Sequence, residues 1–372
     1  MAKKRVLITG GAGFIGSHVA SRLLSSGYSV RILDNLSPQV HRNGERPPYL
    51  SEHAELIVGD IRDEMPVERA LRGVDAVIHM AAAVGVGQSM YEIVSYTQIN
   101  DCGTAVLLQA LAQRPVERLI CASSMSVYGE GLARDANGRI VAPPERSSEQ
   151  LRGGRWEIED EDGAPLTPLP TPETKQPSLS SVYALNKFAQ ERLCLIAGRA
   201  YAIPTFALRF FNVYGPHQAL SNPYTGVLAI FAARLLNNKP PLVFEDGLQR
   251  RDFVHVQDVA QACLLALEAD RGAFETYNIG SGDSRSILSV AADLARVMNR
   301  AAIVPQIVGK YRMGDIRHCF ADVRKSRAML GFVPQVRFEA GLAELAEWLS
   351  GQVAEDRVDR ATAELESRGL VA

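Results

Sequence analysis

The sequence lacks the features that mark several classes of protein. None of its five cysteines forms a Cys-x-x-Cys pair, which favours reduced thiols in a cytoplasmic protein and argues against a zinc site. No apolar run approaches the roughly 18 residues that a membrane-spanning helix needs. The formal net charge of −2 supplies no basic field of the kind that attracts nucleic acid. We therefore expect a cytoplasmic protein with no metal, no membrane segment and no nucleic-acid partner.

A glycine-rich turn near the start of the chain is the first positive signal. The turn, Gly10-Gly11-Ala12-Gly13-Phe14-Ile15-Gly16, follows the apolar run 5–9, which has the composition of a buried parallel strand. Val19 and Leu23 then recur at helical spacing. A strand, a glycine turn and a helix in this order place a pyrophosphate at the helix N-terminus. The segment therefore predicts a dinucleotide site.

Asp34 indicates which dinucleotide binds. It follows the next predicted strand, which begins at Tyr28. A carboxylate at this place would hydrogen-bond the ribose diol of NAD and repel the 2′-phosphate of NADP. We therefore predict NAD as the cofactor.

Predicted strands and helices continue to alternate along the chain. Further apolar runs of strand length lie at 55–58, 75–80, 118–122 and 205–208, with helical patterns between them. This alternation is typical of a doubly wound parallel sheet, which binds ligands at the carboxyl ends of its strands. We predict an α/β protein with a Rossmann-type doubly wound parallel sheet and a smaller, interleaved C-terminal lobe that binds the substrate.

The expected boundaries follow from this division. The NAD-binding domain covers 1–212 and contains a polar insertion at 131–172. The substrate-binding lobe covers 213–349, from which about 249–269 returns to the first domain. Residues 350–372 form a C-terminal tail with the apolar spacing of a short helix.

Tyr183 and Lys187 are four residues apart in a predicted helix at 182–197. Residues with this spacing share one face of a helix, so the phenol and the ammonium lie side by side. A free tyrosine has a pKa of about 10, and lowering it to 7 takes roughly 4 kcal/mol. A neighbouring Lys and an oxidised nicotinamide would favour the phenolate, because both are positively charged. Tyr183 is therefore a candidate general base.

Taken together, the ordered motifs resemble those of the extended short-chain dehydrogenase/reductases, in the group of nucleotide-sugar epimerases and dehydratases. The resemblance covers roughly residues 4–349. The motifs are Gly10-x-x-Gly13-x-x-Gly16, Asp34, Gly59-Asp60, His79-Met80-Ala81-Ala82, Ser123-Ser124, Tyr183-x-x-x-Lys187, Arg209-Phe210-Phe211-Asn212, Arg251-Asp252-Phe253-Val254-His255-Val256-x-Asp258 and Arg312-x-Gly314-Asp315.

The resemblance implies a role for each matching residue. Ser124 matches the hydroxyl that hydrogen-bonds the reacting sugar oxygen, Tyr183 the catalytic base and acid, and Lys187 the residue that holds the nicotinamide ribose. The implied NAD-binding residues are Gly10, Gly13, Phe14, Ile15, Gly16, Asp34, Asn35, Asp60, Ile61, Met80, Ala81, Ala82, Asn100, Tyr183, Lys187 and Phe211. The implied contacts of a nucleotide-diphosphate sugar are Val86, Gln88, Ser124, Ser126, Tyr183, Asn212, Phe244, Arg251, Arg312 and Asp315.

Departures from the family pattern narrow the expected activity. The related 4,6-dehydratases carry an acid pair where this chain has Met125 and Ser126, and the glutamate of decarboxylating relatives is also absent. Glucuronate epimerases tend to have threonine at the place of Asn212. These differences argue against a dehydratase, a decarboxylating enzyme and a glucuronate epimerase, which leaves a simple 4-epimerase as the favoured activity and a 4-ketoreductase as the alternative. The intact Ser124, Tyr183 and Lys187 argue against a non-catalytic NAD-binding sensor or scaffold.

The insertion suggests a substrate. Its polar, proline-rich sequence, Gly131 to Pro172, resembles an insertion in a subgroup of thymidine-diphosphate-rhamnose 4-epimerases. It contains no cysteine, so the zinc ribbon of some subgroup members is not expected here. Two interpretations stay open for this segment: a solvated insertion without function, and a lid over the sugar pocket. For Phe244 the alternatives are packing against the nucleotide base and simple core packing.

The positions nearest the sugar include no Lys or Arg that would receive a carboxylate: Val84, Val86, Met125, Ser126 and Asn212. This favours dTDP-L-rhamnose over UDP-glucuronate, with UDP-glucose and UDP-N-acetylglucosamine as alternatives that Gln88 and Ser126 would serve. Surplus apolar residues on the predicted helices 104–111 and 182–197 lead us to expect a homodimer, as in the family. They are Val106, Leu107, Leu108, Leu111, Leu185, Phe188, Leu193, Leu195 and Ile196.

Overall fold

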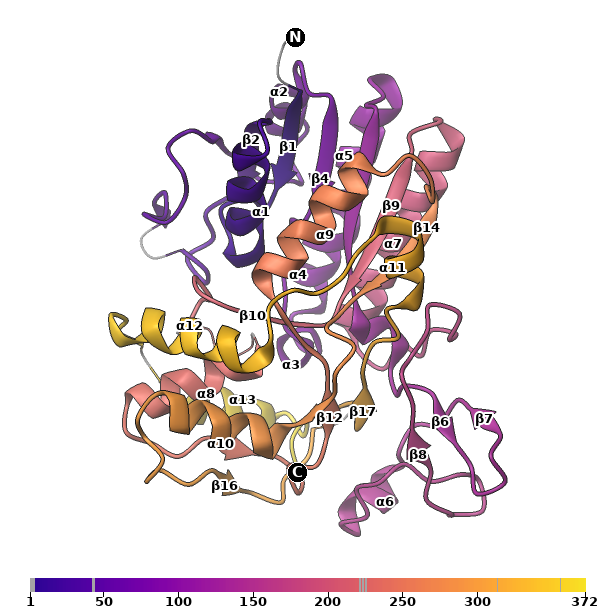
Figure 1. Ribbon diagram of the computed structural model, residues 1–372, viewed down its shortest axis with the longest axis vertical. Helices are drawn as coiled ribbons and strands as arrows, with labels where there is room; N and C mark the ends of the chain where they lie inside the picture. Colours follow the sequence, from indigo (N-terminus) through magenta and orange to yellow (C-terminus); the bar gives the residue numbers. More distant parts are fainter. Residues whose placement is uncertain are drawn as a thin grey trace.

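The central element of the computed structural model is a parallel sheet in the order β14-β9-β5-β4-β1-β2-β3 (Figure 1). Residues 4–41, 44–220, 222, 224, 226–312, 314–354 and 356–372 are described. The strands are β1 (Arg5–Thr9), β2 (Ser29–Asp34), β3 (Glu55–Val58), β4 (Ala76–His79), β5 (Arg118–Ser124), β9 (Thr205–Phe210) and β14 (Glu275–Ile279). After β3 the chain crosses back to the other side of β1 and forms β4, which confirms the predicted doubly wound sheet.

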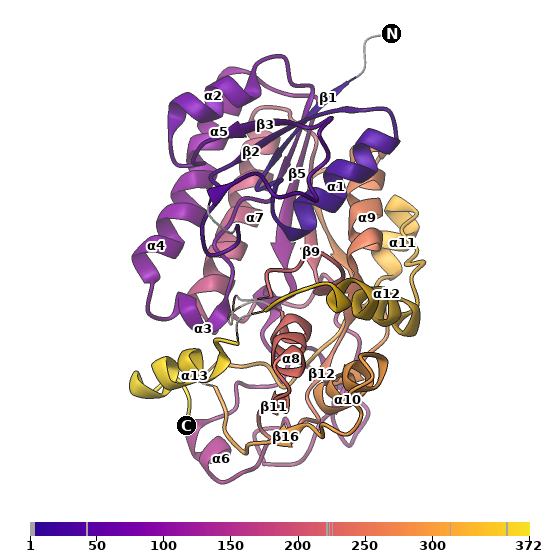
Figure 2. The same cartoon turned by 90° about the vertical axis from the view of Figure 1, so that its left-hand side faces the viewer.

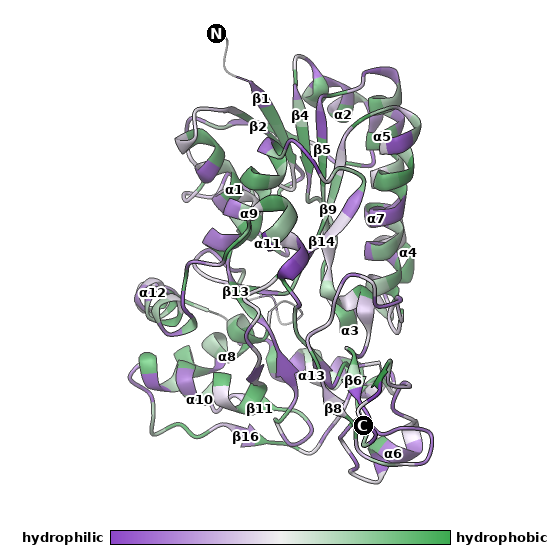
Figure 3. Ribbon diagram, turned by 45° about the vertical axis from the view of Figure 1, so that its right-hand side comes forward, coloured by the Kyte–Doolittle hydropathy of each residue, from purple (hydrophilic) through white to green (hydrophobic). Residues whose placement is uncertain are grey.

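Helices cover both faces of this sheet (Figures 1 and 2). Val6 and Ile8 of β1 pack with α1 (Phe14–Ser25) and α9 (Val256–Glu268), whereas Leu7 between them packs on the other face. That face carries α2 (Glu64–Leu71), α5 (Gly103–Gln113) and α7 (Val182–Ala200). Because both faces are covered, the inner strands carry apolar residues on both faces rather than on one. Figure 3 shows these hydrophobic residues along β1 and α9.

A bent helical segment connects β4 to α5. It consists of α3 (Val86–Ser89), α4 (Ile93–Thr97) and the π-helical turn η2 (Gln98–Cys102), which continues into α5. A short 3₁₀ turn, η3 (Met125–Tyr128), follows β5. These pieces lie at the carboxyl ends of the strands, where the fold class places its ligands.

The second lobe has its own hydrophobic core. It packs α8 (Val227–Leu236), α10 (Ile287–Val297) and α12 (Phe338–Ser350) together. Its strand pairs are β10 (Asn212–Tyr214) with β13 (Phe253–His255), β11 (Leu242–Val243) with β16 (Gln306–Ile307), and β12 (Arg250–Arg251) with β15 (Arg285–Ser286) and β17 (His318–Cys319). The helix α9 lies in the chain between these strands but packs on α1 of the first lobe, and α11 (Arg324–Leu330) also lies on that side.

The insertion forms a small unit of its own beside the second lobe (Figure 1). Three two-residue strands, β6 (Ala133–Arg134), β7 (Ile140–Val141) and β8 (Thr167–Pro168), pair antiparallel, and α6 (Ser148–Arg152) follows β7. Ala133, Ile158 and Leu166 form its buried core. A backbone bridge from Thr171 to Ala321 attaches the end of the insertion to the second lobe.

The C-terminal tail is packed against the rest of the protein. It contains the predicted helix, α13 (Val358–Ser367), whose apolar residues Val358, Ala361 and Leu365 are buried. The last residue, Ala372, exchanges two backbone hydrogen bonds with Tyr311, at 2.9 and 3.1 Å. In the described ranges, no helix combines the length and the apolarity that crossing a bilayer requires.

Candidate active site

The glycine turn between β1 and α1 is built for close approach. Gly10 has φ +68°, and a Cβ there would lie 2.9 Å from the backbone of Ala81. A Cβ on Gly16 would lie 2.5 Å from the carbonyl oxygen of Gly10, so this glycine lets helix and strand pack closely. At Gly13 the side of the turn is open, because the nearest atom to a Cβ would be 3.5 Å away.

Gly13 is also the N-cap of α1, and no described side chain caps this helix. The N–H groups of the first helical turn therefore stay available to an anion, and the helix dipole favours negative charge there. The open turn and the uncapped helix fit the pyrophosphate of NAD.

Asp34 lies beside the same turn, at the end of β2. Its carboxylate accepts hydrogen bonds from the backbone N–H of Ala12 (3.0 Å) and of Leu36 (2.9 Å). The side chain therefore fixes the glycine turn as well as presenting a negative charge to it. Asn35 donates to the carboxylate of Asp60 at 3.1 Å, at the carboxyl end of the neighbouring strand. A hydrogen bond from Arg62 lowers the pKa of Asp60 to about 2.

The loop after β4 forms the opposite wall of the cofactor site. Thr9 Oγ1 accepts hydrogen bonds from the N–H groups of Met80 and Ala81, both at 3.2 Å. Asn100 accepts from the N–H of Ala83 at 2.8 Å and donates to its carbonyl oxygen at 3.1 Å. Asn100 is fully buried, so its role in the structure is to shape this loop.

Two other predicted cofactor residues are buried in the same way. Ile61 lies against Gly103, where a Cβ would be 2.6 Å from its side chain. Phe211 belongs to a buried cluster with Met125 and Tyr128. Both shape the walls of the site from behind.

The structure brings the predicted catalytic residues together. Ser124 ends β5, and Tyr183 lies in the first turn of α7, which the hydroxyl of Ser181 caps by accepting from the N–H of Ala184 at 3.1 Å. Burial raises the pKa of Tyr183, and a hydrogen bond with Ser124 acts in the opposite direction. Burial lowers the pKa of Lys187. In the protein alone, burial is the largest effect on the pKa of Tyr183 and Ser124 is the group that opposes it, so the lowering expected from Lys187 stays a prediction.

A buried chain of hydrogen bonds continues behind Lys187. Its Nζ donates to Gln190 Oε1 at 2.6 Å, and Gln190 Nε2 donates to Thr104 Oγ1 at 2.9 Å. Thr104 Oγ1 lies 2.9 Å from Nε2 of His79, whose Nδ1 lies 2.7 Å from Thr9 Oγ1. The chain thus links the lysine to the strand that precedes the glycine turn.

The sequence interpretation missed Gln190, although its position three residues after Lys187 is a helical-neighbour signal. His79 serves a structural role in this chain of hydrogen bonds. Burial and the charge of Lys187 lower its pKa to about 3, so the ring is neutral at physiological pH.

The residues predicted to hold the nucleoside diphosphate also converge. The guanidinium of Arg312 lies 4.4 Å from the ring centroid of Phe244. Arg251 donates to the carbonyl oxygen of Arg317 at 2.9 Å and lies 3.4 Å from the Asp315 carboxylate. Phe244 is half-buried, so simple core packing does not describe it.

Asn212 and Gln88 of α3 differ in whether their side chains are free to hydrogen-bond a substrate. The side-chain oxygen of Asn212 is buried and has no hydrogen-bond partner in the part of the chain that the structure describes. Gln88, by contrast, accepts from Gln39 (2.8 Å) and Tyr96 (3.1 Å) and donates to Glu92 (3.0 Å). Its amide is occupied within the protein, which does not favour a hydrogen bond to substrate.

Comparison with known proteins identifies the family. Residues 6–149 and 161–280 match the NAD dependent epimerase/dehydratase family. The chain belongs to this family. The family match leaves out 150–160, which lies inside the insertion. The predicted family, its NAD dependence and its enzyme class are thereby confirmed.

Individual members of the family are similar over almost the whole chain. A dTDP-L-rhamnose 4-epimerase of Burkholderia thailandensis is 38% identical, covering 94% of this chain and 96% of that protein. The UDP-glucose 4-epimerase of Thermotoga maritima, solved with UDP-glucose, has a TM-score of 0.76 and 31% identity, covering 93% of this chain and 98% of its own. The UDP-glucose 4-epimerase of Thermus thermophilus, solved with NAD, has a TM-score of 0.73 and 32% identity, covering 94% and 100%.

Proposed function

We propose that this protein is an NAD-dependent nucleotide-sugar 4-epimerase that interconverts dTDP-L-rhamnose and its C4 epimer. The observation that carries the proposal is that Ser124, which ends β5, and Tyr183, in the first turn of α7, meet at the carboxyl edge of the sheet, close enough for Ser124 to lower the pKa of Tyr183. Beside it stand Met125 and Ser126, neither of which can serve as the second acid or base that water loss requires. This set of groups supports proton transfer at one sugar hydroxyl and no further chemistry.

Tyr183 takes the proton of the C4 hydroxyl and later returns it, while Ser124 hydrogen-bonds the same oxygen. When bound, NAD would supply the acceptor and donor of the C4 hydride and, in its oxidised form, a positive charge that favours the phenolate. Lys187 and the glycine turn would hold it. Arg251 and Arg312 hold the diphosphate while the 4-keto sugar turns to present its other face, because guanidinium groups bind phosphate oxygens in pairs.

The similarity of the whole chain to a dTDP-L-rhamnose 4-epimerase supports the rhamnose nucleotide as substrate. Val84 is 45% exposed at the start of the segment that carries Val86, and Met125, which is 6% exposed, directly follows β5. A methyl group at C6 suits such apolar neighbours, whereas a carboxylate would be buried without a counter-charge. The alternative substrates are UDP-glucose and UDP-N-acetylglucosamine, supported by the UDP-glucose 4-epimerases of similar structure.

The experiment is incubation of the purified protein with dTDP-L-rhamnose, UDP-glucose, UDP-N-acetylglucosamine and UDP-glucuronate, with products identified by NMR. We expect the highest kcat/KM for dTDP-L-rhamnose and little conversion of UDP-glucuronate. A higher kcat/KM for a UDP sugar would reject the substrate and keep the epimerase. Failure to epimerise any of the four would reject the proposed function.

We also propose that the protein is a cytoplasmic homodimer joined through α4 and α7. Exposed apolar side chains gather on these two helices: Ile93, Val94, Leu185, Leu193 and Ile196. The α5 residues expected at the interface do not support that part of the prediction. Leu107, Leu108 and Leu111 are buried against the sheet, because α5 points its apolar stripe at the strands. Leu195 of α7, also expected at the interface, is only 2% exposed and does not support the prediction either.

A further inference from the structure

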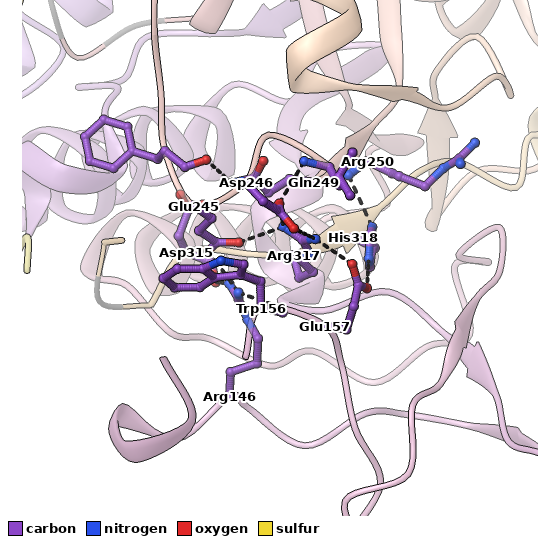
Figure 4. Close-up of polar contacts among 12 residues, drawn as sticks. Arg146, Trp156, Glu157, Glu245, Asp246, Gln249, Arg250, Asp315, Arg317 and His318 are labelled. Atoms are coloured by element: carbon purple, nitrogen blue, oxygen red, sulfur yellow. Dashed lines mark hydrogen bonds and ion pairs between the residues drawn. The ribbon is translucent and has the colours of Figure 1, made fainter. Parts of the chain in front are cut away.

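Arg146 is a buried arginine in a segment whose sequence indicates a solvated loop. Only 3% of its side chain is exposed. Its guanidinium donates to Glu245 Oε1 at 2.8 Å and to the carbonyl oxygens of Trp156 and Asp315, both at 3.0 Å (Figure 4). Burying an arginine costs free energy unless its donors are hydrogen-bonded. These three contacts are therefore a specific feature of how the insertion packs.

The first partner, Glu245, directly follows Phe244. Its backbone has φ +53°, the left-handed conformation that a residue other than glycine adopts only at a cost. The carboxylate is 2% exposed and is held from its other side by Arg317, at 2.9 Å. Arg146 therefore helps to hold the backbone at the residue that sets the position of Phe244.

The second partner, the carbonyl group of Asp315, belongs to the loop that also carries Arg312. The guanidinium of Arg312 lies over the Phe244 ring, and the Asp315 carboxylate pairs with Arg251. One side chain of the insertion thus contacts two of the segments that carry the predicted nucleotide contacts, those of Phe244 and Arg312.

The insertion has further attachments that do not depend on Arg146. Its Glu157 accepts hydrogen bonds from Arg317 and His318, and the Trp156 ring lies 6.1 Å from the ring of Tyr311. These contacts would keep the insertion docked when Arg146 is replaced. The effect of Arg146 on ligand binding can therefore be measured in a folded protein.

We propose that the insertion is part of the nucleotide-binding site and that Arg146 is a positioning residue, which holds the Phe244 and Arg312 segments in the arrangement that receives a nucleoside diphosphate. This inference deepens the proposed function and rests on it for the ligand class. It differs from both earlier interpretations of the insertion, a solvated segment without function and a lid over the sugar pocket, because it assigns the segment to the nucleotide end of the site.

The test compares Arg146→Met with Arg152→Met, a control in the exposed part of α6. Titration calorimetry with dTDP and with UDP measures the dissociation constant of each variant, and the bound NAD is measured after denaturation. For the nucleotide that the parent binds more tightly, we expect Arg146→Met to raise the dissociation constant by about tenfold or more, since it leaves a buried carboxylate without one partner. The NAD content of Arg146→Met should match that of the parent. The NAD content and the dissociation constant of Arg152→Met should also match those of the parent. In turnover, KM should rise far more than kcat falls.

A rescue separates positioning from general damage. Glycine adopts φ +53° without strain, so Arg146→Met combined with Glu245→Gly should bind the nucleotide more tightly than Arg146→Met alone. The same combination with Glu245→Ala should recover less, because alanine keeps the strain. Should Arg146→Met fail to fold, Arg146→Lys, which keeps the charge but loses the paired donors, replaces it in both comparisons.

An unchanged dissociation constant in the Arg146 variant, or a glycine double variant no tighter than the single one, would overturn the proposal. So would a parent that binds neither dTDP nor UDP. A parent that binds a nucleotide but epimerises no nucleotide sugar would reject the proposed function alone, and the binding comparison would still decide the role of Arg146.

Discussion

The ammonium group of Lys187 donates a hydrogen bond to Oε1 of Gln190, 2.6 Å away in the next turn of α7. Both side chains are buried. Gln190 is neutral, so it orients the lysine without cancelling the positive charge that favours a Tyr183 phenolate. A carboxylate at the same place would cancel it.

Gln190→Glu should therefore shift the pH dependence of turnover. The base is active when deprotonated, and burial already raises the pKa of Tyr183. A new negative charge beside Lys187 raises that pKa further, so the rising limb of kcat against pH moves to higher pH. The measurement is a pH profile beside that of Gln113→Glu, which makes the same change on an exposed residue of α5. If the rising limb of the Gln190→Glu profile lies at the same pH as that of the parent, the assigned role of Gln190 is wrong.

Tyr183→Phe should abolish most of the turnover while the fold and the NAD content remain. The expected loss in kcat is at least about a hundredfold, because general acid–base catalysis contributes on that scale. Steady-state kinetics with dTDP-L-rhamnose provides the value. Tyr201→Phe, at the exposed end of α7, is the control and should be unchanged. Near-parental turnover of a folded Tyr183→Phe protein would show that another group carries the proton.

Asp34 should determine the choice between NAD and NADP. Asp34→Ala removes the negative charge and the acceptors of the backbone N–H groups of Ala12, in the glycine turn, and of Leu36, so it should weaken NAD and relax the discrimination against NADP. Asp34→Asn keeps an acceptor, so it should relax discrimination with a smaller loss of NAD. Dissociation constants of both cofactors test this, with Asp63→Asn as an exposed control. Equal binding of NAD and NADP by the parent would refute the assignment.

The proposed dimer should dissociate when charge is placed on α7. Leu185 and Ile196 are 51% and 56% exposed, and an arginine at both places would be buried without a partner in the interface. Light scattering at micromolar concentration should show a dimer for the parent and a monomer for the double variant. Val304→Arg, in the second lobe and 73% exposed, should stay dimeric. A monomeric parent would end the proposal.

The C-terminal helix should contribute measurably to stability. Leu365 is 5% exposed and packs on α3, where a Cβ on Gly87 would lie 3.3 Å from it. Leu365→Ala should lower the free energy of unfolding by about 2–4 kcal/mol, as buried leucine truncations do. Urea unfolding of this variant and of Arg360→Ala, on the exposed side of α13, makes the comparison. Equal midpoints for the two variants would mean that the tail does not stabilise the fold.

The sequence by itself determined the fold class, the family and the pairing of Tyr183 with Lys187. These depend on local spacing: strand and helix periodicity, a glycine turn between them, and two side chains one helical turn apart. Each of these signals lies within a few residues, where backbone geometry leaves little choice. The parallel sheet then brings the strand ends to one edge.

Only the tertiary structure decided what the remaining polar residues do. The sequence places Arg146 in a polar insertion, but its partners Glu245 and Asp315 lie 99 and 169 positions later in the chain. The side-chain amides of Gln88 and Asn100 likewise hydrogen-bond within the protein, and the leucines of α5 pack in the core. The burial and pairing of a polar group depend on which distant segments pack around it, and the local spacing of residues does not predict which segments these are.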